Sequence, residues 1–212
     1  MDAQDLIQSV LRGALTGRRK RGRNAFGYLT HGQGSFLNAS TLLTLGGLAW
    51  GVYEAATSKT GSLGGGQPSE PTAPPPLPGA GVPMPGNVDP AALRLVRLTI
   101  SAARADGTLH EAERQKILDE ARKAGALELV QAEIEEPRPL SQILAGVSEL
   151  NQRQDLYVLA FAVVRADETV SGAERIYLAQ LAHQLSLSAD ETQALEELAA
   201  ARIDARDESA LA

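Results

Sequence analysis

Apolar residues recur every three to four positions through most of residues 89–206, the spacing that places them on one face of an α-helix. The first such run contains Leu93, Val96 and Ile100 and follows Asp89-Pro90, a pair typical of a helix start. Six further helices are predicted: five approximately over residues 110–123, 126–136, 139–149, 171–187 and 188–206, and one that begins near Asn151 and leads into the second acidic turn at Asp167. No strand pattern interrupts them, so residues 89–206 are predicted to form an all-α domain with a core of its own.

One motif occurs twice within these helices. Residues 104–114 read RADGTLHEAER and residues 165–175 read RADETVSGAER, at an offset of 61 positions. In each copy an apolar run leads to the Asp, a polar turn follows, and a new helix begins near the Glu. Repetition of this kind predicts two pseudo-symmetric helix–acidic turn–helix units that pack face to face about a pseudo-two-fold axis.

The chain begins with a second apolar pattern. Residues 2–16 place apolar side chains at helical spacing, and a basic cluster, RRKRGR, follows at 18–23. Residues 1–23 are therefore predicted to be an amphipathic helix plus a basic cluster. The helix has two alternative roles, packing against another helix or lying on a membrane surface.

Residues 24–56 are an apolar, glycine-rich segment. Residues 24–53 contain no charged side chain, and residues 36–53 are predominantly apolar. A basic cluster before this stretch, and Trp50 and Tyr53 near its far end, favour insertion into the bacterial inner membrane as a single span. The alternative is a buried or amphipathic helical hairpin of a soluble, cytoplasmic protein.

Small residues at Gly47, Gly51 and Ala55 would let two such spans approach closely, which predicts a possible homo-oligomer. Residues 57–88 hold most of the chain's eleven prolines and are predicted to be a disordered Pro/Gly-rich linker. Residues 207–212 are predicted to be a tail.

Charge differs between the two ends of the chain. From residue 89 onward there are 22 acidic and 13 basic residues, a difference of −9, against −6 for the whole chain. Such an acidic body argues against nucleic-acid binding and leaves a protein partner for the acidic domain. The absence of cysteine excludes disulfides, thiolate metal ligands and a cysteine nucleophile. No catalytic motif stands out, so the protein is predicted not to be an enzyme.

Four carboxylates of the two motifs are candidate ligands for a divalent cation, Ca²⁺ or Mg²⁺: Asp106, Glu113, Asp167 and Glu174. The spacing of the first copy matches the second half of an EF-hand loop, but Ala102 and Arg104 occupy its first and third positions, so each repeat offers half a site. His110 could add a nitrogen ligand. The alternative is that these carboxylates cap helices and pair with arginines of the motifs, which are Arg104, Arg114, Arg165 and Arg175.

The duplicated acidic turn in an all-helical domain resembles the tellurite-resistance TerB-like family. The order of amphipathic segment, glycine-rich stretch TLGGLAWGVYEAA (44–56), linker and helical domain resembles its membrane-annotated branch, the YebE-like inner-membrane proteins of unknown function. The resemblance implies a bacterial helical bundle with an acidic, metal-binding surface, linked to envelope or metal stress and without established enzymatic activity. The second copy departs from the pattern, because Glu168 stands where the first has Gly107.

Two hypotheses follow. The first is a non-enzymatic, membrane-tethered module that binds a divalent cation or a partner protein through its acidic turns. The second is a soluble helical interaction or adaptor protein in which the acidic residues are only helix caps.

Overall fold

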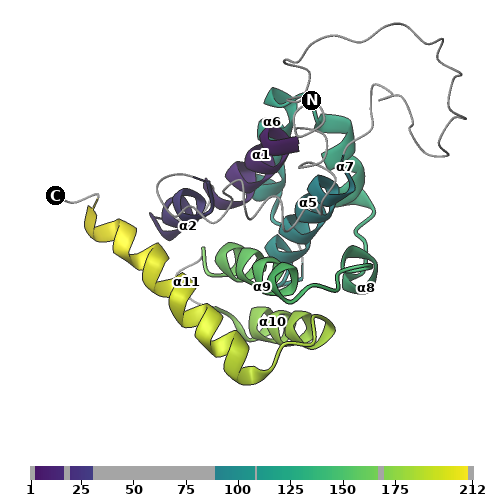
Figure 1. Cartoon of the computed structure of the whole chain (residues 1–212). Helices are drawn as coiled ribbons and strands as arrows, with labels where there is room; N and C mark the ends of the chain where they lie inside the picture. The colour runs from purple at the N-terminus through teal and green to yellow at the C-terminus, as the bar shows by residue number, and fades with distance from the viewer. Residues whose placement is uncertain (1–2, 17–19, 31–88, 108, 167–169, 210–212) are drawn as a thin grey trace, which may run out of the picture.

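The computed structural model describes residues 3–16, 20–30, 89–107, 109–166 and 170–209, and all regular structure within these ranges is helical (Figure 1). The prediction of an all-α bundle is confirmed. The N-terminal helices are α1 (Ala3–Thr16) and α2 (Lys20–Thr30). The helices after residue 88 are α5 (Pro90–Ala103), α6 (Glu111–Lys123), α7 (Leu127–Glu135), α8 (Leu140–Ile143), α9 (Leu150–Val164), α10 (Gly172–Gln184) and α11 (Ala189–Ser209).

The duplication extends well beyond the motif. Helices α6 and α10 begin and end at positions that differ by 61, and α5 and α9 agree to within one residue. Both second helices end in the same way, because Gly125 and its counterpart Ser186 adopt positive φ angles of 71° and 53°. In each copy the next residue donates its N–H to a carbonyl five positions back, which satisfies the helix end. The first repeat is therefore α5–α6–α7, and the second is α9–α10–α11.

The centre of the molecule lies where the two repeats meet. The first helices of the two repeats, α5 and α9, pack against each other, and α9 is buried on almost every side. Leu98, Leu156 and Leu159 are fully shielded from solvent there. Tyr177 of α10 adds a polar link between the repeats, because its hydroxyl donates to the Ser101 hydroxyl over 3.1 Å. The two predicted units thus share one hydrophobic core.

Helix α1 packs along α6 and α5 (Figure 1). Leu6, Leu11 and Leu15 are completely buried by this contact. The helices approach so closely that a Cβ atom added to Gly13 would lie 2.5 Å from the Ile117 Cα atom. Of the two roles predicted for the helix of residues 2–16, the structure shows packing against other helices. The core therefore extends beyond the predicted domain of residues 89–206.

Helix α2 packs on α11 and α1, with further contacts to α9. It takes up residues 20–30, which include the start of the segment predicted as 24–56, and buries Ala25, Tyr28 and Leu29. Residues 24–30 carry no charge and were included in the predicted membrane segment for that reason, yet their apolar side chains pack inside the helical body. The predicted span 36–53 and the linker 57–88 lie outside the described residues, as do Gly47, Gly51 and Ala55.

Two predicted helix lengths are wrong. The helix expected over 139–149 is only the four-residue α8, and the chain after it turns through Gly146, whose φ is 78°. The last helix continues to Ser209 instead of ending before residue 207, because no proline or glycine interrupts it. No helix within the described part of the chain is both long and apolar enough to cross a membrane.

Candidate functional site

The predicted cation ligands take different positions. Asp106 is exposed at the first turn, Glu113 is partly buried at the start of α6, and Glu174 is buried at the start of α10. Asp167 lies outside the described residues, so convergence of all four carboxylates stays a prediction. No group of three or more His, Asp or Glu side chains that could hold a metal ion occurs in the described ranges.

Two of these carboxylates make capping hydrogen bonds. Glu174 accepts the backbone N–H of Ser171 over 2.7 Å, and the Ser171 hydroxyl accepts the Glu174 N–H over 3.2 Å. This reciprocal pair is a capping box, so Glu174 takes the helix-capping role given above as the alternative to cation binding. Glu113 accepts the His110 N–H over 3.3 Å at the equivalent position of α6. Both glutamates thus satisfy backbone donors that a helix start leaves unpaired.

The first acidic turn needs a glycine. Gly107 has a φ of 121°, a region that residues with a Cβ atom rarely adopt. The counterpart Glu168 lies outside the described residues. We expect a residue with a Cβ atom to be strained in a turn of the same shape.

The motif arginines reach across to neighbouring elements. Arg104 donates to the Ile134 carbonyl at the end of α7 over 2.9 Å, and its counterpart Arg165 pairs with Asp204 of α11 at 2.9 Å. The first arginine therefore holds α7 against α5, and the second holds α11 against α9. The third helix of each repeat is fixed by the arginine that opens the motif.

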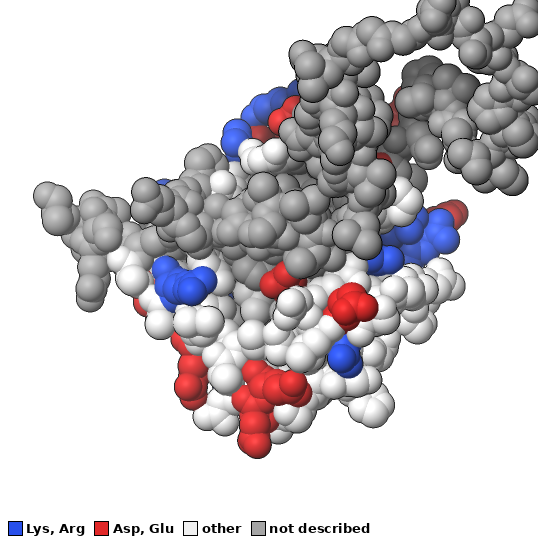
Figure 2. Space-filling view, viewed as in Figure 1, with Lys and Arg blue, Asp and Glu red and all other residues white. Residues whose placement is uncertain are grey.

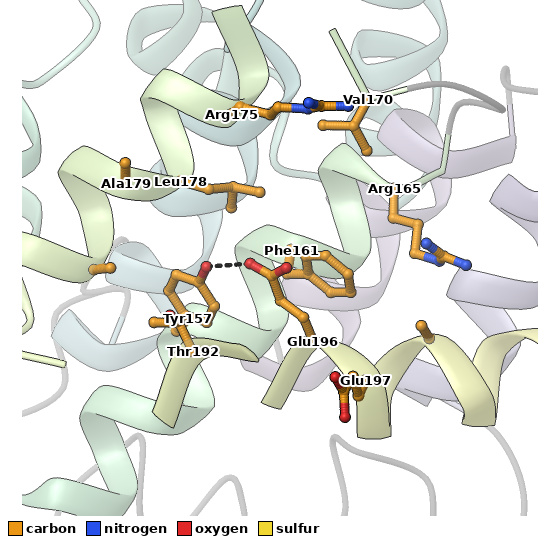
Figure 3. Close-up of a pocket in the computed structure, with 12 residues that line it drawn as sticks. Tyr157, Phe161, Arg165, Val170, Arg175, Leu178, Ala179, Thr192, Glu196 and Glu197 are labelled. Carbon is orange, nitrogen blue, oxygen red and sulfur yellow. Dashed lines mark hydrogen bonds between the residues drawn. The ribbon is translucent and has the colours of Figure 1, made fainter. Parts of the chain in front are cut away.

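A groove of about 520 Å³ lies between α9, α10 and α11 (Figure 3). Phe161, Val170 and Leu178 form part of its apolar lining, and Ala182 and Ala200 add small side chains. Apolar surface of this kind together with a few polar groups is typical of a binding site. The groove is the strongest candidate for a functional site in the described residues.

Opposite charges line the groove. Arg165 and Arg175 belong to the second copy of the motif, and Glu196 and Glu197 belong to α11 (Figure 3). Figure 2 shows acidic side chains over the lower part of the face in view. Helix α11 itself begins with two acidic residues, Asp190 and Glu191. Acidic side chains of α11 thus contribute both to the groove and to the acidic body predicted from the charge balance.

One polar contact fixes the inner end of the groove. The Tyr157 hydroxyl donates to the Glu196 carboxylate over 2.5 Å. Burial and this hydrogen bond raise the pKa of Tyr157 above its ordinary value, so the phenol stays protonated. Tyr157 is accordingly a hydrogen-bond donor, and it holds the Glu196 side chain against α9.

A second hollow of about 430 Å³ lies between α5, α10 and the chain at 137–140. Arg104 and Arg138 line it with Tyr177 and with Ile176, whose exposed fraction is 62%. This hollow is lined by residues of both repeats. Its lining carries positive charge only, whereas the larger groove carries both signs.

Reasoning from sequence pointed to the acidic turns and missed the groove. A signal was present: at an offset of 61, Leu118 of the first repeat is replaced by Ala179 in the second, and Glu111 by Gly172. These substitutions remove bulk and charge from one face of α10. Comparing the repeats for their differences, instead of for their shared motif, would have indicated this face.

Comparisons with known proteins cover nearly the whole described chain. A family described as "Protein of unknown function (DUF533)" matches residues 3–199. The chain is 31% identical over 114 residues to an "Uncharacterized protein in ampR 5'region" of Yersinia enterocolitica, and the match covers 52% of this chain and 80% of that protein. No solved structure matches the chain.

Proposed function

The chain belongs to the DUF533 family of proteins of unknown function, and we propose that it is a non-enzymatic interaction module that binds a protein partner in the groove between α9, α10 and α11. The observation that carries the proposal is the groove itself, which combines an apolar floor with arginines on one side and glutamates on the other. Apolar area supplies affinity, and charges at the rim select and orient the partner.

A binding role suits the chemistry of the groove better than catalysis. Its only phenol keeps its proton, since burial and the bond to Glu196 raise the pKa of Tyr157. One oxygen of Glu196 is thereby engaged as an acceptor, and Arg165 is held by Asp204. Groups fixed in this way shape a surface, and we assign no reaction to them.

We further propose that residues 36–53 tether this module to the bacterial inner membrane. The support is the uncharged stretch after the basic cluster 18–23, with Trp50 and Tyr53 near its end. The TerB-like resemblance agrees with the family, while the YebE-like branch and a link to envelope or metal stress stay predictions. Fractionation tests the tether: release of the full chain by a carbonate wash would contradict it.

For the acidic turns we favour the role of helix caps. Glu113 and Glu174 each accept a backbone N–H at a helix start, which is the contact that capping requires. Binding of Ca²⁺ or Mg²⁺ at Asp106, Glu113, Asp167 and Glu174 stays a prediction, and a titration described in the Discussion distinguishes it from capping.

Site-specific crosslinking tests the groove. A photo-crosslinking amino acid at Ala179, which lines the groove, should give one discrete adduct with another protein in the full-length chain in cells. The matched position is Ala112, an exposed alanine of α6, which should give none. The adduct should disappear with Arg175→Glu. Equal labelling from both alanines, or an adduct that survives Arg175→Glu, would contradict the assignment of the groove.

A further inference from the structure

The two repeats present equivalent faces that meet different surroundings. In the first repeat, α1 lies along α6 and α5 and crosses α6 at Ile117, next to Gly13. In the second, the counterpart of Ile117 is Leu178, which lines the groove. The groove therefore occupies the place in the second repeat that α1 fills in the first.

Individual positions support this equivalence. Leu118 and Ala121 of α6 are buried, with 7% and 0% exposure. Their counterparts Ala179 and Ala182 both line the groove, Ala179 exposed and Ala182 partly exposed. At these two positions the helix is thus covered in one repeat and accessible in the other.

The remaining helices do not replace α1 on this face. Helix α11 follows α10 as α7 follows α6, so it is the counterpart of α7. Helix α2 packs on α11, α9 and α1. Within the described part of the chain, α10 contacts α9, α8 and, through Tyr177, α5, but no helix runs along it as α1 runs along α6.

Arg175, at the edge of the groove, lacks the ion-pair partners that its counterpart Arg114 has in the first repeat. In the first repeat, Arg114 lies 3.9 Å from Glu111 and 3.6 Å from Glu135. At an offset of 61 these glutamates become Gly172, which has no side chain, and Glu196, which accepts from Tyr157. Arg175 makes no ion pair with another described residue, so its charge is available to a carboxylate from outside.

We propose that the groove is the second repeat's seat for an amphipathic helix, and that a helix of a partner protein lies along α10 as α1 lies along α6. The inference rests on the proposed interaction function and names the partner's form. The partner helix carries apolar residues at the i, i+3, i+4 and i+7 spacing of α1 and an acidic residue opposite Arg175. Binding of an amphipathic helix in an apolar groove is a recurrent mode of recognition.

The absence of native cysteine permits a direct test, because one introduced thiol reports on one position. The full-length chain with Ala179→Cys is labelled with a maleimide, with and without a synthetic peptide of residues 2–17 as the probe. We expect saturating peptide to slow labelling at least about tenfold, since a bound helix would cover the thiol. The matched control, Ala112→Cys, should be labelled at the same rate with and without peptide.

Two further variants identify the contact. A peptide in which Leu11 is replaced by Asp should give no protection, because the apolar stripe is broken. Arg175→Glu in the chain should weaken protection by the native peptide. Labelling of Leu118→Cys should stay slow throughout, since that position lies under α1.

Three outcomes would overturn the inference. They are a labelling rate at Ala179→Cys that millimolar peptide leaves unchanged, protection that survives the Leu11 replacement, and faster labelling at Leu118→Cys, which would mean that the peptide displaces α1 instead of entering the groove. If the peptide does not protect the thiol of Ala179→Cys while crosslinking from Ala179 still yields its adduct, the groove binds a partner of another shape. The interaction function then stands without the helix.

Discussion

The two repeats of this protein share their first two helices, the glutamate that caps the second helix, and the positive φ angle at its end, and they differ in what covers that second helix. In the first repeat α1 seals the face of α6, so that Ile117 is completely buried. In the second, the corresponding face of α10 opens on a groove with Arg175 at its edge. One copy of a duplicated unit has become core, and the other has kept an accessible surface. A duplicated fold can thus hold stability in one half and binding in the other.

The strongest test of this difference between the repeats is to truncate the equivalent side chain of the second helix in each of them. Ile117→Ala should lower the free energy of unfolding by about 2–5 kcal/mol, near the upper end, because α1 and α6 both surround that side chain. Leu178→Ala, the equivalent change, should cost less, because one side of Leu178 faces the groove. Urea unfolding of the two variants measures the difference. Equal losses would mean that the second face is covered as well as the first.

The contact between α1 and α6 is tested at its tightest point. Gly13→Val should destabilise the fold by about 1–3 kcal/mol, since even a Cβ atom would lie 2.5 Å from the Ile117 Cα atom and the helices must move apart. Gly172→Val is the matched control, because a Cβ atom at Gly172 meets no atom within 4 Å. A thermal melt that drops for both variants alike would contradict the close crossing of α1 over α6.

Alkaline pH should act mainly on the second repeat. Burial and Glu196 raise the pKa of Tyr157, so the folded state holds the phenolic proton more tightly than the unfolded chain does. The resulting stability is fully present below the unfolded pKa of about 10 and is lost as the pH rises beyond it. The counterpart in the first repeat is Val96, which cannot titrate.

Urea midpoints measured at about pH 8 and about pH 11 should therefore differ less for Tyr157→Phe than for the native chain. Burial also raises the pKa of Tyr177, so part of the alkaline loss should remain in that variant. If Tyr157→Phe left the loss unchanged, the hydroxyl would not be held at Glu196 as described.

The smallest effect is expected from divalent cations. A bound cation near Asp106 and Glu113 would stabilise the fold by roughly 2.7 kcal/mol at a hundredfold excess over its dissociation constant. Because Glu113 and Glu174 already cap helices, we expect millimolar Ca²⁺ or Mg²⁺ to leave the melting temperature unchanged. A rise that disappears with Asp106→Asn and Glu113→Gln would instead establish the cation site, and Asp167→Asn with Glu174→Gln would show whether the second turn contributes.

Local rules were enough to predict most helices. Asp89 caps α5 by accepting the Ala91 N–H, Ser188 and Glu191 form the expected capping box before α11, and α7 ends before Pro137. These signals act over a few residues, so sequence alone contains them. The length of α8 was not predictable in this way, because the apolar residues Leu144 and Val147 continue the helical spacing past the turn at Gly146.

The groove depends on which helices pack against each other, and local sequence patterns do not show this. An amphipathic stripe shows that a helix has an apolar face, but it does not show which surface covers that face. Residues 2–16 gave no indication that they would pack on α6, some hundred positions away, and so nothing distinguished the covered α6 from the accessible α10. The replacement of Leu118 by Ala179 leaves an open groove only because, in the folded structure, no helix of the described ranges covers α10 as α1 covers α6.

The long sequence separation between α1 and α6 has a consequence during synthesis. Its partner residue Ile117 is translated 104 positions after Gly13. At about 5–20 residues per second, roughly 5–20 s pass before α6 leaves the ribosome. Throughout that interval the apolar stripe of α1 has no α6 to cover it, while the residues between them emerge. Until α6 is available, the apolar stripe of α1 is therefore accessible to other surfaces, such as a chaperone or a lipid layer.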